Sequence, residues 1–299
     1  MLTSKMESND ANCLDLPDFF KEIDGELWLV EEERGNMKIQ YRVKEVLLSE
    51  YTPYQHISII DTYDFGRCLV LDGIMQTTEL DGPMYNEMVA HVPVAIHKNP
   101  KGILIIGAGA CGVINELTKY PFIERIDVVE IDKVVVQESI DKLKCIAGNG
   151  YSDERVHFFF EDGSKFVKDK QNCYDIVIID SSDPIGPSRI LYSEEFYSDV
   201  KSALKEDGLL ICQSESPLFY KEILKTIRKR LKNLFPIIKT YKLIVPCFPG
   251  GIWSLTMASK KYSPEDADPN LLPPNTMHIN KELLKSCFDL PNFMKDDLE

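Results

Sequence analysis

Residues 103–112 have the sequence Ile-Leu-Ile-Ile-Gly-Ala-Gly-Ala-Cys-Gly, an apolar run that leads directly into a Gly-x-Gly-x-x-Gly pattern. The apolar run is typical of a buried strand, and the segment 113–120 that follows is predicted to be a helix. Glycine lets a backbone turn tightly and approach a ligand, and the start of a helix offers unpaired N–H groups. Gly107 and Gly109 therefore predict a nucleotide-binding turn, although alone they also fit an ordinary turn at the edge of a sheet.

The chain after this turn alternates between predicted strands and helices. We expect strands over 103–106, 126–130, 156–160, 176–179 and 209–213. We expect helices over 113–120, 134–143, 164–168, 194–204 and 220–234. This alternation predicts a doubly wound, mainly parallel sheet with helices on both faces. Two last strands, over 237–245 and 253–259, are expected to form an antiparallel edge.

The first third of the chain has a different pattern. Its alternating, β-branched and aromatic segments predict a small antiparallel sheet with strands over 37–48, 55–61, 68–71 and 74–77. A helix is expected over 84–96, and Asn99-Pro-Lys-Gly then breaks the chain. We therefore expect a flexible extension over 1–24, a β domain with a linking helix over 25–98, and an α/β domain over 99–299.

Composition limits the classes of function. The 299 residues carry a formal net charge of -14, which argues against nucleic acid or an anionic membrane as a partner and favours cationic ligands. No apolar segment suits export or membrane insertion, so a cytoplasmic location is expected. The eight cysteines contain no Cys-x-x-Cys pair and fit free thiols in a reducing compartment.

Acidic residues follow several of the predicted strands. Asp180 ends a buried strand, and Asp183 lies three residues later in a loop stiffened by prolines, so the two carboxylates predict a cation site. A helix N-cap or a solvated turn is the plainer alternative. Glu130 ends the second strand, where a carboxylate can accept hydrogen bonds from ribose hydroxyls, and Asp162 is placed to accept from an adenine amino group.

A dehydrogenase that uses NAD is the natural rival, because it shares the glycines and the acid after the second strand. It would also need a histidine or lysine as its acid or base, and the five histidines form no cluster in the sequence. No Gly-x-Ser-x-Gly, P-loop or metal-ligand spacing occurs, so hydrolase, phosphotransferase and metalloenzyme functions are not favoured and no metal is expected.

The motifs, taken in order, resemble those of the polyamine aminopropyltransferases, the spermidine synthase family, from about Trp28 to Lys261. They are Tyr54-Gln-His56, Leu71-Asp-Gly-Ile-Met-Gln76 with Thr78-Glu79, Tyr85-x-Glu87-Met88, Gly107 to Gly112, Val129-Glu-Ile-Asp132 and Asp180 to Pro187. The resemblance implies an N-terminal β domain with a gate segment, joined to a Rossmann-like methyltransferase-type domain. It also implies aminopropyl transfer from decarboxylated S-adenosylmethionine to an amine such as putrescine, giving spermidine and methylthioadenosine. A homodimer or homotetramer without a permanently bound cofactor is expected.

The resemblance also assigns roles to residues. Asp180 is expected to orient the attacking amine and take its proton. The residues expected to bind the donor are Gln55, Gln76, Gly107, Gly109, Glu130, Asp162 and Gly163. The residues expected to bind the amine, a small di- or polyamine, are Tyr85, Asp81, Asp183 and Phe248.

The chain departs from the family pattern at the amine end of the site. Ala110 replaces an aspartate that pairs with the amino group of the aminopropyl arm, a charged hydrogen bond worth about 1.5 to 3 kcal/mol. Gly82 and Phe248 replace an acid and a tyrosine. Three functions stay open: aminopropyl transfer, an S-adenosylmethionine-dependent amine N-methyltransferase, and a non-catalytic paralogue that binds polyamine or a catalytic homologue.

Overall fold

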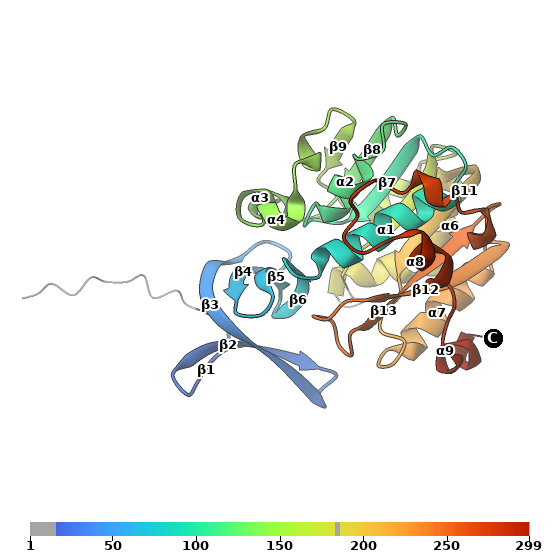
Figure 1. Cartoon of the computed structure of the whole chain (residues 1–299). Helices are drawn as coiled ribbons and strands as arrows, with labels where there is room; N and C mark the ends of the chain where they lie inside the picture. Colours follow the sequence, from blue (N-terminus) through green and yellow to red (C-terminus); the bar gives the residue numbers. More distant parts are fainter. Residues whose placement is uncertain (1–15, 183–185, 299) are drawn as a thin grey trace, which may run out of the picture.

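The computed structural model describes residues 16–182 and 186–298, and their strands form two sheets (Figure 1). The first sheet has six antiparallel strands that neighbour one another in chain order. They are β1 (Phe20–Ile23), β2 (Glu26–Glu33), β3 (Met37–Tyr51), β4 (His56–Thr62), β5 (Gly66–Leu71) and β6 (Ile74–Thr78). The predicted N-terminal antiparallel sheet is thereby confirmed.

The first two strands of this sheet were not predicted from the sequence. β1 lies inside the predicted extension over 1–24, so the extension is wrong for residues 20–23. Phe20 is the reason, because it is buried and pairs opposite Leu29 of β2. Residues 1–15 lie outside the described part of the chain.

The second sheet has seven strands in the order β12-β13-β11-β10-β7-β8-β9. The strands are β7 (Gly102–Gly107), β8 (Arg125–Val129), β9 (Val156–Phe159), β10 (Tyr174–Asp180), β11 (Leu204–Gln213), β12 (Ile237–Ile244) and β13 (Ile252–Ser259). The pairs among β7 to β11 are parallel, while β13 is antiparallel to both β11 and β12. This topology confirms the predicted doubly wound sheet with an antiparallel edge.

Helices cover both faces of the seven-stranded sheet (Figure 1). They are α1 (Gly82–Ile96), α2 (Gly112–Leu117), α3 (Lys133–Lys142), α4 (Lys144–Ala147), α5 (Gly163–Lys168), α6 (Glu194–Ala203), α7 (Lys221–Lys232), α8 (Lys281–Ser286) and α9 (Asn292–Leu298). Side chains alternate along β7, so Ile103 and Ile105 pack with α1 and α2, whereas Leu104 and Ile106 pack with α5, α6 and α7. Burial on both faces explains why the inner strands are continuous apolar runs.

Helix α1 connects the two sheets and is buried along most of its length. It begins after β6 and packs against α2 and several strands of the larger sheet. The Tyr241 hydroxyl donates to the Met88 carbonyl at 3.1 Å, which ties the helix to β12. Because α1 is held this way, the side chains of its first turns have fixed positions between the two sheets. The proposed boundary between domains at about residue 99 stays a prediction.

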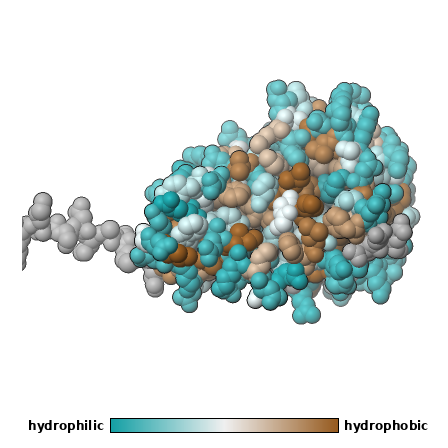
Figure 2. All heavy atoms as spheres, turned by 60° about the horizontal axis from the view of Figure 1, so that its bottom comes forward, coloured by the Kyte–Doolittle hydropathy of each residue, from teal (hydrophilic) through white to brown (hydrophobic). Residues whose placement is uncertain are grey.

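The surface mixes hydrophilic and hydrophobic residues, as one face shows in Figure 2. The most exposed large apolar side chains, Tyr51, Ile244 and Met277, are distributed over both parts of the molecule. Within the described residues, none of the helices has the length and apolar character needed to cross a membrane.

Candidate active site

A cavity of about 520 Å³ lies where the carboxyl ends of β7, β8 and β10 meet the six-stranded sheet. Its volume is in the range of small-molecule sites. The loops after the parallel strands contribute one wall, as expected for an open α/β sheet. Strands β2 and β6 and the first turns of α1 contribute the opposite wall. The site therefore depends on both sheets.

The glycine turn after β7 brings two strand ends into contact. Gly107 has φ +93°, and a Cβ atom there would lie 2.1 Å from the Asp180 carbonyl oxygen. That oxygen accepts a hydrogen bond from the Ala108 amide at 3.0 Å. Only glycine fits this conformation and this close approach. The nucleotide turn predicted from the sequence thus also fixes the end of β10.

Asp180 and Tyr85 are in contact on the wall of the cavity. The Tyr85 hydroxyl, from the first turn of α1, donates to Asp180 Oδ1 at 2.7 Å. Burial raises the pKa of Asp180 to about 6, although the bond from Tyr85 opposes that rise. Burial and the nearby Asp180 raise the pKa of Tyr85 well above its usual value. Near neutral pH the pair is therefore a carboxylate held by a neutral phenol, suited to bind an ammonium group or take a proton.

Two of the predicted nucleoside ligands lie at the ends of neighbouring strands. Glu130 follows β8 and accepts from the Asp132 amide at 3.0 Å, and burial raises its pKa to about 7. Asp162 follows β9 and caps α5 by accepting from the Ser164 amide at 2.9 Å. Both line the cavity.

The remaining predicted donor residues also line the cavity. Gln55 lies in the connection between β3 and β4, and its side chain donates to Asp132 Oδ2 at 3.0 Å, which joins the two walls. Gln76 donates to the Ile74 carbonyl at 3.2 Å. A Cβ atom at Gly109 would lie 3.1 Å from Glu130 Oε2, so the backbone there passes close to that acid. The structure brings these residues together with Gly107 and Gly163.

The predicted amine ligands are only partly brought together. Phe248 lines the cavity, with its ring centroid 6.0 Å from that of Tyr85 and 4.6 Å from that of Trp253. Asp183 lies outside the described residues.

Asp81 is not part of the cavity wall. Its side chain is fully buried and accepts from the Thr78 hydroxyl at 2.6 Å and from the Cys247 amide at 2.7 Å. We therefore correct its expected contact with the amine: Asp81 holds the segment that carries Phe248. The sequence pattern could not separate the two roles, because an acid in a loop suits either.

Sequence reasoning missed several lining residues, which are Glu31, Glu33, Asn86, Gln213, Tyr220 and Trp253. Glu31 and Glu33 lie on β2 and are 2% and 5% exposed. The local sequence contains no clear signal for them, because residues 31–33 are three consecutive glutamates and only the strand geometry separates Glu31 and Glu33 from the exposed Glu32. Gln213 accepts a hydrogen bond from the Trp253 indole N–H at 3.0 Å, a contact between neighbouring strands that are 40 residues apart in sequence, so no local pattern indicates it.

The electrostatic character of the cavity is one-sided. Among its described lining residues none is Lys, Arg or His, and those with carboxylates are Glu31, Glu33, Asp72, Glu130, Asp162 and Asp180. Acids in a partly desolvated cleft attract cations strongly and repel anions. The cavity therefore suits a ligand that carries several positive charges.

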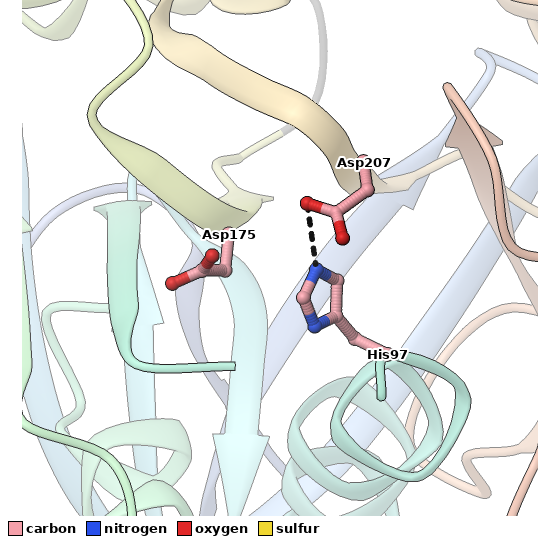
Figure 3. A group of neighbouring side chains, drawn as sticks. All are labelled: His97, Asp175 and Asp207. Atoms are coloured by element: carbon pink, nitrogen blue, oxygen red, sulfur yellow. Dashed lines mark ion pairs between the residues drawn. The ribbon is translucent and has the colours of Figure 1, made fainter. Parts of the chain in front are cut away.

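A histidine and two aspartates lie together at the amino ends of β10 and β11, away from the cavity (Figure 3). The Asn99 amide donates to His97 Nδ1 at 3.2 Å, so Nε2 carries the proton and points toward Asp207 Oδ1, 3.8 Å away. Asp175 Oδ2 accepts from the Lys205 ammonium at 2.9 Å. A metal ion would have to displace the Nε2 proton and compete with this lysine, so we interpret the cluster as a structural link between α1 and the sheet.

Two protein-family models match the chain. Residues 82–268 match the spermine/spermidine synthase domain, and residues 27–79 match the spermidine synthase tetramerisation domain. The second segment covers most of the six-stranded sheet, and the first covers α1 and the seven-stranded sheet. Together they contain the described residues of the site that the sequence predicted, except Asp81, which lies between the two matched segments.

Similar proteins extend over nearly the whole chain. A polyamine aminopropyltransferase of Thermoanaerobacter sp. (strain X514) is 45% identical over 272 residues, covering 91% of this chain and 98% of that protein. One of Moorella thermoacetica is 42% identical over 274 residues, covering 91% and 96%. A crystal structure of spermidine synthase in complex with the transition state analogue AdoDATO has a TM-score of 0.88 at 36% identity, covering 91% of this chain and 94% of the other. The crystal structure of spermidine synthase from Thermotoga maritima has a TM-score of 0.87 at 35% sequence identity, and it also covers 91% of this chain and 94% of the other.

Proposed function

Because the chain belongs to the spermine/spermidine synthase family, we propose that it transfers an aminopropyl group from decarboxylated S-adenosylmethionine to a diamine such as putrescine. The products are spermidine and methylthioadenosine. Aminopropyl transfer in polyamine biosynthesis is the family's activity, and the chain is an aminopropyltransferase. The observation that carries the choice of substrates is a cavity rich in carboxylates, with the Asp180–Tyr85 pair inside it.

The reaction needs an unprotonated amine in line with a carbon next to a sulfonium. The amine nitrogen forms a bond to the methylene carbon of the aminopropyl arm while the C–S bond breaks, and the electron pair stays on sulfur as a thioether. Asp180 orients the amine and takes the proton that the nitrogen loses. Its pKa near 6 suits this role, because at neutral pH the carboxylate is free to accept. Tyr85 holds Asp180 in place through its hydroxyl.

The donor's nucleoside lies along the edge formed by β7, β8 and β9. Glu130 accepts from the ribose hydroxyls and Asp162 from the adenine amino group, while the Gly107 turn lets the backbone approach. Their positions at adjacent strand ends and on the cavity wall support these roles. Gln55 and Gln76 cover the donor from the other sheet.

The tail of the donor points to the least typical part of the site. Ala110 lines the cavity where the family pattern has an acid, and the Asn86 side chain lies beside the same turn. The amide of Asn86 can accept from an ammonium group or donate to a carboxylate. This neutral tail region favours one second candidate, methyl transfer from intact S-adenosylmethionine, more than a charged region would.

The acceptor spans from Asp180 toward β2. One ammonium group lies at the Asp180–Tyr85 pair and the other at Glu31 and Glu33, with Phe248 and Trp253 beside the methylene groups. Burial of both glutamates supports this assignment, because a buried carboxylate is stabilised by a cation.

The nucleoside product tests the proposal. The purified protein is incubated with putrescine and either decarboxylated or intact S-adenosylmethionine, and the nucleosides are separated by chromatography. We expect methylthioadenosine from the decarboxylated donor, formed only when the amine is present. Formation of S-adenosylhomocysteine from the intact donor, without methylthioadenosine from the other, would support methyl transfer instead.

The N-terminal segment supports self-association, because it matches a tetramerisation domain. We propose a homodimer or homotetramer, to be measured by light scattering of the full chain. The described cysteines are unpaired, which agrees with a reducing compartment, and a cytoplasmic location stays a prediction.

A further inference from the structure

Strand β2 presents two carboxylates to the cavity and one to solvent. Glu31 and Glu33 are buried and line the cavity. Glu32, between them, faces the other way and pairs with Lys38 at 2.5 Å. This follows from the alternation of side chains along a strand. Glu33 therefore lines the cavity on the side that β2 forms, and Glu32 is a neighbouring acid outside it.

Tyr220 links Glu33 of the six-stranded sheet to the part of the molecule built around the seven-stranded sheet. It immediately precedes α7, it lines the cavity, and its hydroxyl donates to Glu33 Oε2. The Arg34 guanidinium carbon lies 5.8 Å from the ring centroids of both Phe219 and Tyr220. A charge-assisted hydrogen bond and a cation over the ring thus hold the Tyr220 side chain in one position.

We propose that Glu33 and Tyr220 form the end wall of the amine compartment and thereby select a diamine over a longer polyamine as acceptor. The inference rests on the proposed aminopropyl transfer and names the class of acceptor for the same site. Glu33 contributes charge that binds the terminal ammonium, and the Tyr220 ring contributes the barrier beyond it.

The physical basis is the cost of a longer acceptor. A diamine places its second ammonium group at Glu31 and Glu33 and leaves the Tyr220–Glu33 hydrogen bond intact. A triamine carries a further aminopropyl arm, which must displace the Tyr220 ring and break a hydrogen bond to a buried carboxylate. Rejection by such a wall acts on length, whereas the acidic cavity as a whole attracts any polyamine.

Replacement of the wall residue tests the barrier. We measure kcat/KM for putrescine and for spermidine with the parent protein, Tyr220→Ala and Tyr220→Phe. We expect Tyr220→Ala to raise the ratio of spermidine to putrescine by about tenfold, equivalent to about 1.4 kcal/mol. Tyr220→Phe keeps the ring and loses the hydrogen bond, so the ratio should move in the same direction by a smaller factor. It also provides a readout if Tyr220→Ala does not fold.

A matched pair on β2 tests the charge. Glu33→Gln keeps an acceptor for Tyr220 and removes the charge, so the KM for putrescine should rise by about tenfold with little change in kcat. Glu32→Gln removes an equal charge from the solvent face and should leave KM unchanged.

The outcomes separate this inference from the proposed function. If the parent protein forms aminopropyl product but both Tyr220 variants keep its acceptor ratio, the wall is not at Tyr220. If Glu33→Gln and Glu32→Gln behave alike, Glu33 does not bind the ammonium. If the parent protein forms no aminopropyl product with any amine, the proposed function itself fails.

Discussion

Asp180 is the residue on which the proposed chemistry depends most. Asp180→Asn keeps the size of the side chain and an acceptor for Tyr85, but the amide cannot take a proton or balance an ammonium group. We expect turnover to fall by at least about a thousandfold, which corresponds to about 4 kcal/mol. Affinity for methylthioadenosine, measured by calorimetry, should stay close to that of the parent protein. Turnover within about tenfold of the parent would remove Asp180 from this role.

The raised pKa values of Asp180 and Glu130 predict how the enzyme responds to pH. In the proposed mechanism both carboxyl groups must be ionised, because Asp180 is to accept a proton and Glu130 is to accept hydrogen bonds from the ribose. Their pKa values are about 6 and about 7, so kcat/KM should rise with pH from 5 to above 7 and then level off. Asp180→Asn should remove the lower of the two transitions from the residual rate. An activity that falls over the same interval would contradict the assignment.

Ala110 allows a test of how the donor's tail is selected. Restoring an acid with Ala110→Asp adds a charge that attracts the ammonium group of the decarboxylated donor and repels the carboxylate of the intact one. The affinity ratio should shift toward the decarboxylated donor by about tenfold, or about 1.4 kcal/mol. Parallel calorimetric titrations of both donors measure it. An unchanged ratio would show that position 110 does not face the tail.

Some site residues could be predicted from the sequence and others could not, for physical reasons. Glu130, Asp162 and Asp180 each follow an apolar strand, and parallel strands bring their carboxyl ends to one edge. Asp81 shows where prediction from sequence ends. An acidic residue in a loop can bind a ligand or stabilise the loop, and the local sequence is the same in both cases. Glu33 shows another limit, since its place in the cavity depends on a sheet from a different part of the chain.

At the scale of elements, the turn between β7 and α2 is the segment whose sequence is most restricted by its backbone geometry. Gly107→Ala would place a Cβ atom 2.1 Å from a backbone oxygen of Asp180, and neither atom can move easily. Gly25→Ala is the matched control, because Gly25 has φ +78° with nothing within 4 Å of the added atom. In the control, the free energy of unfolding should fall only by the cost of placing alanine in the left-handed conformation, about 1 to 2 kcal/mol.

Gly107→Ala should therefore lose more stability than Gly25→Ala in urea unfolding, and it alone should lose turnover, because it displaces Asp180. Equal losses of stability, or an active Gly107→Ala enzyme, would show that the turn does not fix the catalytic strand.

The elements were predicted best where periodicity was strong. Strands β7 and β10 are continuous apolar runs covered by helices on both faces, so neighbouring segments alone identify them. Strand β1 has only four residues and was hidden by acidic surroundings, and its stability comes from pairing with β2. Helices α8 and α9 are short and depend on packing against the rest of the molecule, so local sequence gave little signal.

At the scale of the whole molecule, the site is an interface between two sheets. Asp180 ends β10 and Glu130 follows β8 of the seven-stranded sheet, while Gln76 and Glu31 lie on strands of the six-stranded sheet and Gln55 directly precedes its β4. The Gln55 amide donates to Asp132, and the Asp81 carboxylate accepts from the Cys247 amide. These hydrogen bonds fix the two walls of the cavity relative to each other. The acidic net charge of the chain adds attraction for polycations over longer range.

The mass of the amine product tests the central claim most directly. Putrescine is incubated with the purified protein and each donor in parallel, and the amines are analysed by mass spectrometry, with Asp180→Asn as the control. The account predicts that the decarboxylated donor adds one aminopropyl group to the diamine and that the control adds none. A gain of one methyl group from intact S-adenosylmethionine, or no change in mass with either donor, would contradict it.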